Sequence, residues 1–280
     1  SLSSNGKLNE EKVRELVRLQ IENGTDGIVP CGTTGESPAL TTEEKNQLIK
    51  IVVEEARGKA KVIAGTGTNN TEKSVQATAR AKEMGADAAL VITPYYNKPT
   101  QAGLVRHFEA VAEVNLPIMI YNVPGRTAVN MLPATVGELS KLDQIVAIKE
   151  ASGDLNQVSE IITTCKERIQ VLSGDDSLLA PILSVGGVGV VSVVANIVPK
   201  DLKSLFDAFK SNEVKRMQQL HHQLFGLCQA MFYETNPIPV KTAMNLMGMD
   251  VGDLRSPLAP MSDIHKQKLV ETLKAYGLLK

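Results

Sequence analysis

Short apolar runs and longer amphipathic segments alternate along most of the chain. The short runs are rich in Val, Ile and Ala, and the longer segments repeat apolar residues at helical spacing. This alternation is typical of a parallel sheet built from βαβ units. Strands are expected at residues 27–31, 61–65, 88–93, 117–122, 145–149, 169–173 and 188–194. Helices are expected at residues 9–23, 42–57, 72–84, 102–114, 133–139, 155–165 and 177–185.

Only helical patterns follow the last expected strand, at residues 200–210, 214–232, 239–247 and 262–276. We therefore expect a (β/α) barrel over residues 1–212 and a C-terminal helical subdomain over residues 213–280. A closed (β/α)8 TIM-type barrel needs eight strands, and the pattern supplies seven because no strand precedes the helix at 9–23. The alternative is an open, doubly wound sheet, in which the site lies where the strand order reverses.

Composition narrows the possible partners. The chain has 280 residues, 43% of them hydrophobic and 22% charged, which is typical of a globular protein. Its formal net charge of -1 gives no excess of positive charge for binding nucleic acid. No apolar stretch is long enough to span a membrane, and no export signal opens the chain. The three cysteines and four histidines lack disulfide-framework or metal-site spacing. We expect a cytoplasmic protein with no metal, cofactor, nucleic-acid or membrane partner.

Lys149 ends an otherwise apolar strand, where barrel enzymes keep their chemistry. If Val146 and Ile148 face the surrounding helices, alternation puts Ile145, Ala147 and Lys149 on the inner face. An ammonium among apolar neighbours loses hydration, which favours the neutral amine that attacks carbonyl carbons. Taken alone, a strand-end lysine is more often structural and paired with a carboxylate.

Other polar residues follow neighbouring strands. Thr33 and Thr34 lie in a Gly-rich loop whose hydroxyls and N–H groups could hold a carboxylate, or that could be an ordinary turn. Tyr121 could relay protons, and Arg126 in the next loop could clamp a carboxylate bidentately. The alternative is a core tyrosine and a solvated arginine. Cys31 is expected to be a buried small side chain rather than a nucleophile.

Six segments, agreeing in type and spacing, together closely resemble the dihydrodipicolinate synthase family. They are Gly32-Thr33-Thr34-Gly35-Glu36, Pro94-Tyr95-Tyr96-Asn97, Tyr121-Asn122-Val123-Pro124-Gly125-Arg126-Thr127, Ile148-Lys149-Glu150, Ser173-Gly174-Asp175-Asp176 and Asn236-Pro237-Ile238-Pro239-Val240-Lys241. The match runs in order from about Gly6 to the last helix. It is more specific than any single motif, and it implies a TIM-type barrel with class I aldolase chemistry.

The resemblance implies that Lys149 condenses with pyruvate and that the resulting enamine attacks the aldehyde of aspartate semialdehyde. The product is 4-hydroxy-tetrahydrodipicolinate, on the route to diaminopimelate and lysine. The family's proton relay matches Tyr121, Thr33 and Tyr96, with Tyr96 reaching into a neighbouring subunit's site. Arg126 matches the residue that holds the semialdehyde carboxylate. The residues implied to line the pyruvate pocket are Thr34, Gly174 and Val191.

The resemblance also implies a homotetramer built as a dimer of dimers, or a homodimer. The related N-acetylneuraminate lyases share the lysine, the tyrosine and the Gly-x-Thr-Gly-Glu loop, but they lack an arginine placed as Arg126 is. The alternative functions are therefore a related pyruvate aldolase, which cleaves N-acetylneuraminate or a 2-keto-3-deoxy sugar acid, or a catalytically silent small-molecule-binding barrel. Arg126 favours the synthase.

The chain departs from the family's pattern at the first strand. The family supplies about ten apolar residues ending in Thr-Pro, whereas Ser1–Ser4 can extend only about 13 Å and hold one apolar residue. We expect a barrel one strand short, with two unpaired strand edges and lowered stability.

A second departure concerns feedback inhibition by lysine. The residues that match the family's lysine site are Ser37, Asn69 and Tyr95. The family's histidines and glutamate are replaced by Thr42, Lys45 and Lys73, and cations there repel the ammonium of lysine. Any site at these positions is therefore expected to be vestigial.

Lysine-sensitive enzymes have inhibition constants in about the low-millimolar range. Lysine at such concentrations should leave most of the condensation activity of this chain intact. A steady-state assay of the condensation with increasing lysine measures this. Loss of most of the activity in that range would contradict the prediction.

Overall fold

The computed structural model describes residues 7–280, which belong to two compact units. Unit 1 is formed by Ser1–Ala60 and Ser192–Lys280, and unit 2 by Lys61–Val191. The division into a barrel over residues 1–212 and a helical subdomain over residues 213–280 stays a prediction.

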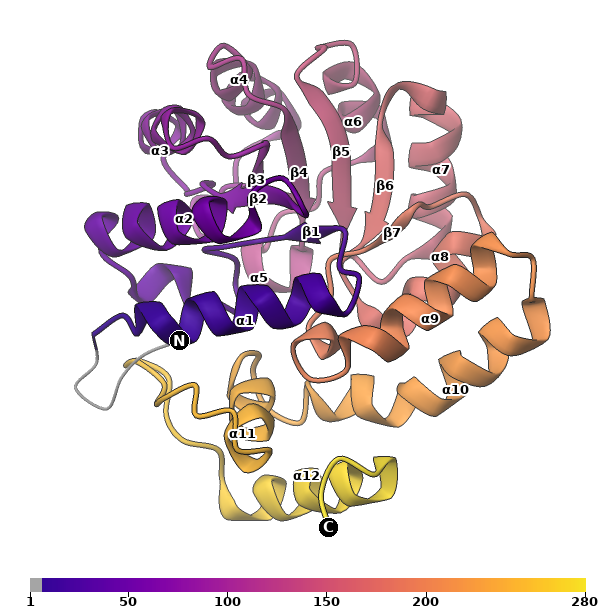
Figure 1. Cartoon of the computed structure of the whole chain (residues 1–280). Helices are drawn as coiled ribbons and strands as arrows, with labels where there is room; N and C mark the ends of the chain where they lie inside the picture. Colours follow the sequence, from indigo (N-terminus) through magenta and orange to yellow (C-terminus); the bar gives the residue numbers. More distant parts are fainter. Residues whose placement is uncertain (1–6) are drawn as a thin grey trace. The chain divides into compact units, whose positions relative to one another are not determined.

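Unit 2 is built around a parallel sheet (Figure 1). Its strands pair side by side in chain order: β2 (Lys61–Gly65), β3 (Ala88–Ile92), β4 (Ile118–Asn122), β5 (Ile145–Glu150), β6 (Gln170–Ser173) and β7 (Gly189–Val190). The main helices are α3 (Thr71–Glu83), α4 (Gln101–Ala112), α6 (Pro133–Leu139), α7 (Leu155–Cys165) and α8 (Leu179–Ser184), and each contacts the next. They lie along the outer side of the sheet, as expected for βαβ units.

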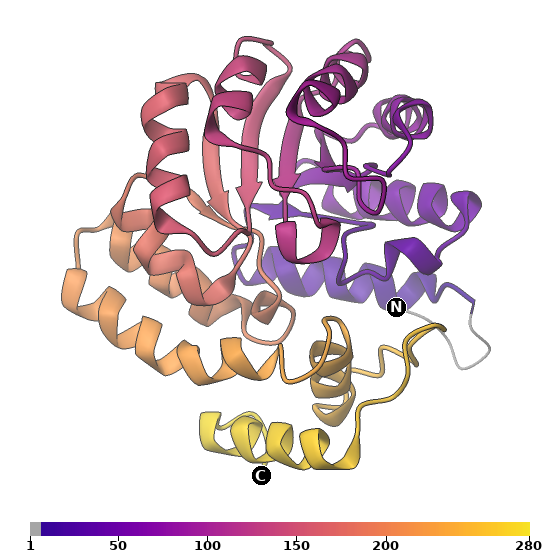
Figure 2. The same ribbon diagram turned by 180° about the vertical axis from the view of Figure 1, so that it is seen from behind.

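Unit 1 is mainly helical (Figure 2). It contains β1 (Gly27–Ile28), α1 (Glu10–Glu22), α2 (Thr42–Ala56), α9 (Pro199–Lys210), α10 (Val214–Ala230), α11 (Ile238–Leu246) and α12 (Asp263–Tyr276). The packed pairs are α1 with α2, α9 with α10, and α12 with both α10 and α11. No helix within residues 7–280 is both long enough and apolar enough to cross a membrane.

All seven predicted strands are present, but two of them are much shorter than predicted. β1 stops at Ile28 because the next residues form turns, with Cys31 at φ 60° and Gly35 donating to the Gly32 carbonyl. β7 stops at Val190, and the 3-10 turn Val194–Asn196 occupies the end of the predicted strand. Turn hydrogen bonds follow β1, and at β7 the last pairing is the Val191 N–H, which donates to the Ser173 carbonyl before the turn begins.

The start of the chain bears on the predicted missing strand. Within the described residues no strand precedes α1, and Leu8 forms only an isolated bridge. The expectation for Ser1–Ser4 lies outside the described residues.

A β-bulge in β5 decides which side chains share a face with Lys149. The pairing with β4 passes from Ile118–Ile145 directly to Met119–Ala147, so Val146 is an extra residue. The prediction that Ile145 shares the face of Lys149 is therefore wrong, because the bulge shifts the alternation by one residue.

Candidate active site

Lys149 lies at the carboxyl end of β5, opposite Tyr121 of β4. Its side chain is buried, with 8% of its surface exposed, and Nζ lies 4.0 Å from the centroid of the Tyr121 ring. The apolar sequence of β4 explains this position, since all five of its residues are buried and hold the strand in the centre of the sheet. The two residues that the sequence singled out are thus neighbours.

The surroundings of Lys149 favour its neutral form. The pKa of its amine is lowered to about 8, mainly because the side chain is buried; the carboxylate of Asp176 opposes this shift, and the positive charge of Arg126 adds a smaller lowering. Asp176 is itself buried, with 4% exposure, and no pattern in the sequence assigned it a role. A substantial share of the amine is therefore unprotonated and nucleophilic in mildly alkaline solution.

Gly174 follows β6 and approaches the Lys149 side chain closely. A Cβ atom at position 174 would lie 3.2 Å from Lys149 Cε and 2.6 Å from the Ala151 Cβ. Val191 is held beside Gly174 because its N–H donates to the Ser173 carbonyl at 2.9 Å. The structure thus brings two of the three predicted pocket residues to the strand ends next to Lys149.

Arg126 lies on α5 (Pro124–Thr127), a single helical turn that the sequence patterns did not predict. Pro124 starts the turn, and the Thr127 hydroxyl ends it by donating to the Val123 and Val129 carbonyls at 3.2 and 2.9 Å. Arg126 is exposed, yet its charge acts on Lys149. A guanidinium there could hold an anionic substrate near the amine.

Tyr95, Tyr96 and Asn69 lie on loops that are tied together through Asn97. The Asn97 amide donates to the Asn69 carbonyl at 2.8 Å, and its backbone N–H donates to the Tyr95 carbonyl at 2.9 Å. Tyr96 is 89% exposed and has φ 74°, a left-handed conformation that is costly for an aromatic residue. The geometry therefore presents the Tyr96 ring outward.

In unit 1, the loop that carries Thr33 and Thr34 is joined to the segment before α11. The Asn236 amide donates to the Thr34 hydroxyl at 3.1 Å, which fixes the hydroxyl's direction. Thr33 accepts a hydrogen bond from the Glu36 N–H through its carbonyl, so its own hydroxyl is not used in closing the turn. Sequence reasoning gave no role to Asn236, although the segment that contains it belongs to the resemblance.

Glu36 anchors the same loop by a buried ion pair. Lys241 Nζ donates to Glu36 Oε1 at 2.6 Å, and the Arg255 N–H donates to Oε2 at 2.8 Å. Both charged side chains are at least nine-tenths buried. A lysine in the apolar segment of α11 was the one signal in the sequence that could have revealed this partner.

Two further residues named from the sequence, Ser37 and Cys31, lie in unit 1. Ser37 starts the 3-10 turn Ser37–Ala39, directly after the anchored loop. Cys31 is buried, and burial raises the pKa of its thiol to about 12, so it is not a nucleophile. The expectation of a buried small side chain is confirmed.

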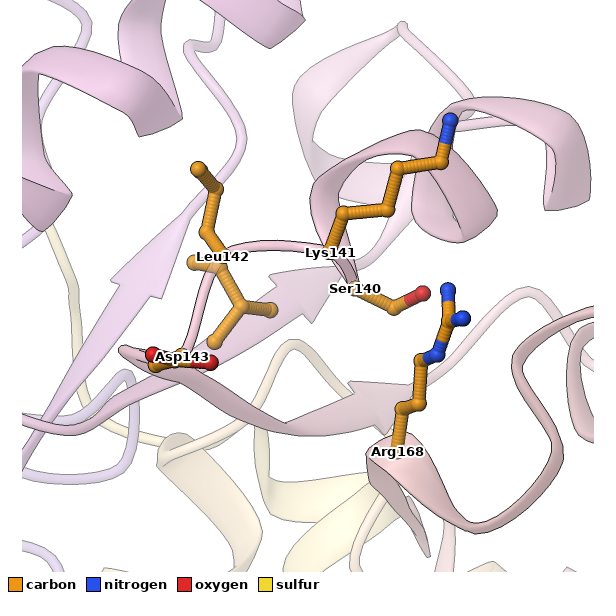
Figure 3. A pocket seen from close by; sticks show the side chains of 6 residues that line it. Ser140, Lys141, Leu142, Asp143 and Arg168 are labelled. Carbon is orange, nitrogen blue, oxygen red and sulfur yellow. The ribbon is translucent and has the colours of Figure 1, made fainter.

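A pocket in unit 2 lies at the other end of β5 (Figure 3). It is lined by Ser140, Lys141, Leu142, Asp143, Ile145 and Arg168. Ile145 starts β5 and Lys149 is four residues further on, about 13 Å at 3.3 Å per residue, so the pocket is remote from the amine. Within residues 7–280 no three His, Cys, Asp or Glu side chains are grouped as a metal site.

Parallel strands, flanking helices and a polar site at the carboxyl ends of the strands are the features of the (β/α) barrel enzymes. The sequence model of the Dihydrodipicolinate synthetase family matches residues 1–276. The chain belongs to this family.

Individual relatives agree with the family. A 4-hydroxy-tetrahydrodipicolinate synthase of Geotalea uraniireducens is 54% identical over 98% of this chain and 95% of its own length. A crystal structure of a dihydrodipicolinate synthase has a TM-score of 0.97 at 50% identity, over 99% of this chain and 96% of that chain. The chloride-inhibited synthase of Acinetobacter baumannii, complexed with pyruvate, has a TM-score of 0.96 at 38% identity, over 99% and 96%. The fold is thus a TIM-type barrel with C-terminal helices.

Replacing Arg126 should move the titration of Lys149 to higher pH. The variant Arg126→Met removes a positive charge that lowers the pKa of the amine, so the reaction of Lys149 with a carbonyl reagent should begin to rise at a higher pH. The measurement is the rate of adduct formation against pH. Arg168→Met, which removes a cation at the far pocket, should leave the midpoint in place. A midpoint that is unchanged or lower in Arg126→Met would contradict the account.

Breaking the buried pair at Lys241 should destabilise the protein. Lys241→Met leaves the Glu36 carboxylate buried without its cation, at a cost of about 3–5 kcal/mol in the free energy of unfolding. The double variant Glu36→Gln with Lys241→Met removes both charges and should lose clearly less. Chemical denaturation of both variants measures this, and equal losses in the two would argue against a charge effect.

Proposed function

We propose that the chain condenses pyruvate with aspartate semialdehyde to give 4-hydroxy-tetrahydrodipicolinate, the product in its relatives' names. The reaction belongs to the route to diaminopimelate and lysine. The observation that carries the proposal is the buried Lys149 amine, with its pKa lowered to about 8 and its nitrogen over the Tyr121 ring. A relative crystallised with pyruvate supports the first substrate.

In this proposal the neutral amine of Lys149 attacks the ketone carbon of pyruvate, and the carbinolamine loses water to form an imine. Loss of a methyl proton gives the enamine, whose carbon forms the new bond to the semialdehyde's aldehyde carbon. The semialdehyde amine then displaces Lys149 as the ring closes, so the lysine is regenerated. Each step moves protons, and Tyr121, Thr33 and a neighbouring subunit's Tyr96 are proposed as the relay.

Two anionic substrates need two carboxylate sites. We assign Thr34, Gly174 and Val191 to pyruvate; at position 174 a side chain would crowd Lys149, since its Cβ would lie 3.2 Å from Lys149 Cε. Arg126 is assigned to the semialdehyde, because it is exposed and its charge reaches the amine. A guanidinium that binds a carboxylate in two places also orients the aldehyde beside it.

The exposed Tyr96 supports assembly into a homodimer or a homotetramer. A strained, outward-pointing aromatic ring is costly unless a partner uses it. We further propose a cytoplasmic location, as suits the substrates, and a vestigial lysine site at Ser37, Asn69 and Tyr95.

Borohydride trapping tests the proposed function. Protein incubated with pyruvate and reduced should gain one pyruvate-derived adduct, located by peptide mass spectrometry on Lys149. Lys149→Arg should lose both adduct and activity, while Lys141→Arg, at an exposed lysine, should keep both. No adduct would favour a silent binding barrel, and faster cleavage of N-acetylneuraminate than condensation with aspartate semialdehyde would favour a lyase.

A further inference from the structure

Four polar side chains form a closed hydrogen-bonded ring behind the candidate active site. They are Asn122, Asn130, Glu150 and Gln157, and we call them the amide–carboxylate ring. Asn122, Glu150 and Gln157 are buried, with 0%, 2% and 7% of their surfaces exposed. None of the four has a role in the proposed reaction.

The ring closes through short contacts. Asn122 Nδ2 donates to Glu150 Oε2 at 3.0 Å and to Asn130 Oδ1 at 2.8 Å. Gln157 Nε2 donates to Glu150 Oε2 at 3.2 Å and to Asn130 Oδ1 at 3.1 Å. Asn130 Nδ2 donates back to Gln157 Oε1 at 2.7 Å. The Ser152 N–H adds a further bond to Glu150 Oε1 at 2.7 Å.

The ring is joined directly to the two reacting side chains through the backbone. Asn122 follows Tyr121 and Glu150 follows Lys149, and the register pairs Tyr121 with Lys149 and Asn122 with Glu150. Because successive side chains of a strand point to opposite faces, the ring lies on one face of this pair of strands and the reacting groups lie on the other. Any shift of the ring residues therefore moves Tyr121 and Lys149 relative to each other.

Glu150 is an unusual residue to bury. Among residues 7–280 it has no ion pair, and its carboxylate is held by amide groups and a backbone N–H. Burying a carboxylate is expensive even when every oxygen accepts hydrogen bonds, and an apolar residue would pack there at less cost. Hydrogen bonds are directional, so a fully satisfied polar network holds its side chains in one arrangement, which apolar packing does not do.

We propose that Glu150 is a positioning residue, which through the amide–carboxylate ring fixes the carboxyl ends of β4 and β5 and so sets the placement of Lys149 against Tyr121. This rests on the proposed function, since the proton transfers of imine formation require the phenol and the amine in a fixed geometry. Met131 extends the restraint, because its N–H donates to Asn122 Oδ1 at 3.0 Å and ties the following loop to β4.

The donor and acceptor pattern of the ring supplies a sharp test. Both Glu150 oxygens accept, so Glu150→Gln turns one of them into a donor that faces the donor groups of Asn122 or Gln157. Gln157→Glu alone puts two carboxylates 3.2 Å apart. The double exchange Glu150→Gln with Gln157→Glu restores the contact between these two positions, because the amide at position 150 can donate to the carboxylate at position 157, which still accepts from Asn130 Nδ2. The donation from position 157 to Asn130 Oδ1 is lost, so the repair is partial.

The experiment measures kcat, the KM for pyruvate and the rate of imine formation, well below the melting temperature of each variant. We expect Glu150→Gln and Gln157→Glu to lower kcat and the imine rate roughly 10- to 100-fold, as small misplacements of reacting groups do, with KM changed much less. The double exchange should recover part of the lost kcat, because it repairs the contact between positions 150 and 157. Gln157→Met removes both the donor and the acceptor of the outer amide but adds no charge. It serves if a charge variant does not fold, and it should lower kcat less than Glu150→Gln does.

Asp87→Asn is the matched control. It makes the same carboxylate-to-amide change at the amino ends of β2 and β3, where Asp87 accepts from the Val62 N–H at 2.9 Å, so it should reduce stability without changing kcat. Full kcat in Glu150→Gln, or no recovery in a folded double exchange, would overturn the proposal. An inactive wild-type protein would instead contradict the proposed function.

Discussion

The parallel pairing of β4 with β5, in the register that sets Tyr121 opposite Lys149, is the constraint on which the chemistry depends. It places the amine nitrogen 4.0 Å from the centre of an aromatic ring and away from water. The bulge at Val146 is part of the same arrangement, because it determines which residues of β5 share the face of Lys149. The amide–carboxylate ring lies on the opposite face of this pair of strands.

The charges around Lys149 suit the proposed reaction, in which the neutral amine attacks the ketone carbon and the imine that follows carries a positive charge. Burial and Arg126 both lower the pKa of the amine, so the nucleophilic form is accessible. Asp176 opposes them, and in the proposed reaction its negative charge would also stabilise the protonated imine. The same arginine that favours the free amine is proposed to hold the second substrate, so one charge serves two steps.

Periodicity located the seven strands and the main helices, because these depend on local sequence. It overestimated β1 and β7, where local turns replace strand pairing, and it missed both the bulge at Val146 and the short helix α5. The proximity of Tyr121 and Lys149 followed from the strand-end rule. The roles of Glu36, Lys241 and Glu150 could not be predicted, since each depends on partners brought together only by tertiary packing.

The central claim is that a buried, easily deprotonated lysine does the chemistry of this chain. The most direct test follows the Lys149 side chain by NMR across a pH titration, with isotope-labelled lysine and Lys149→Arg to assign the signal. The account predicts a midpoint of about 8 for Lys149, below the other lysines. A midpoint close to the ordinary lysine value of 10.5 would contradict it.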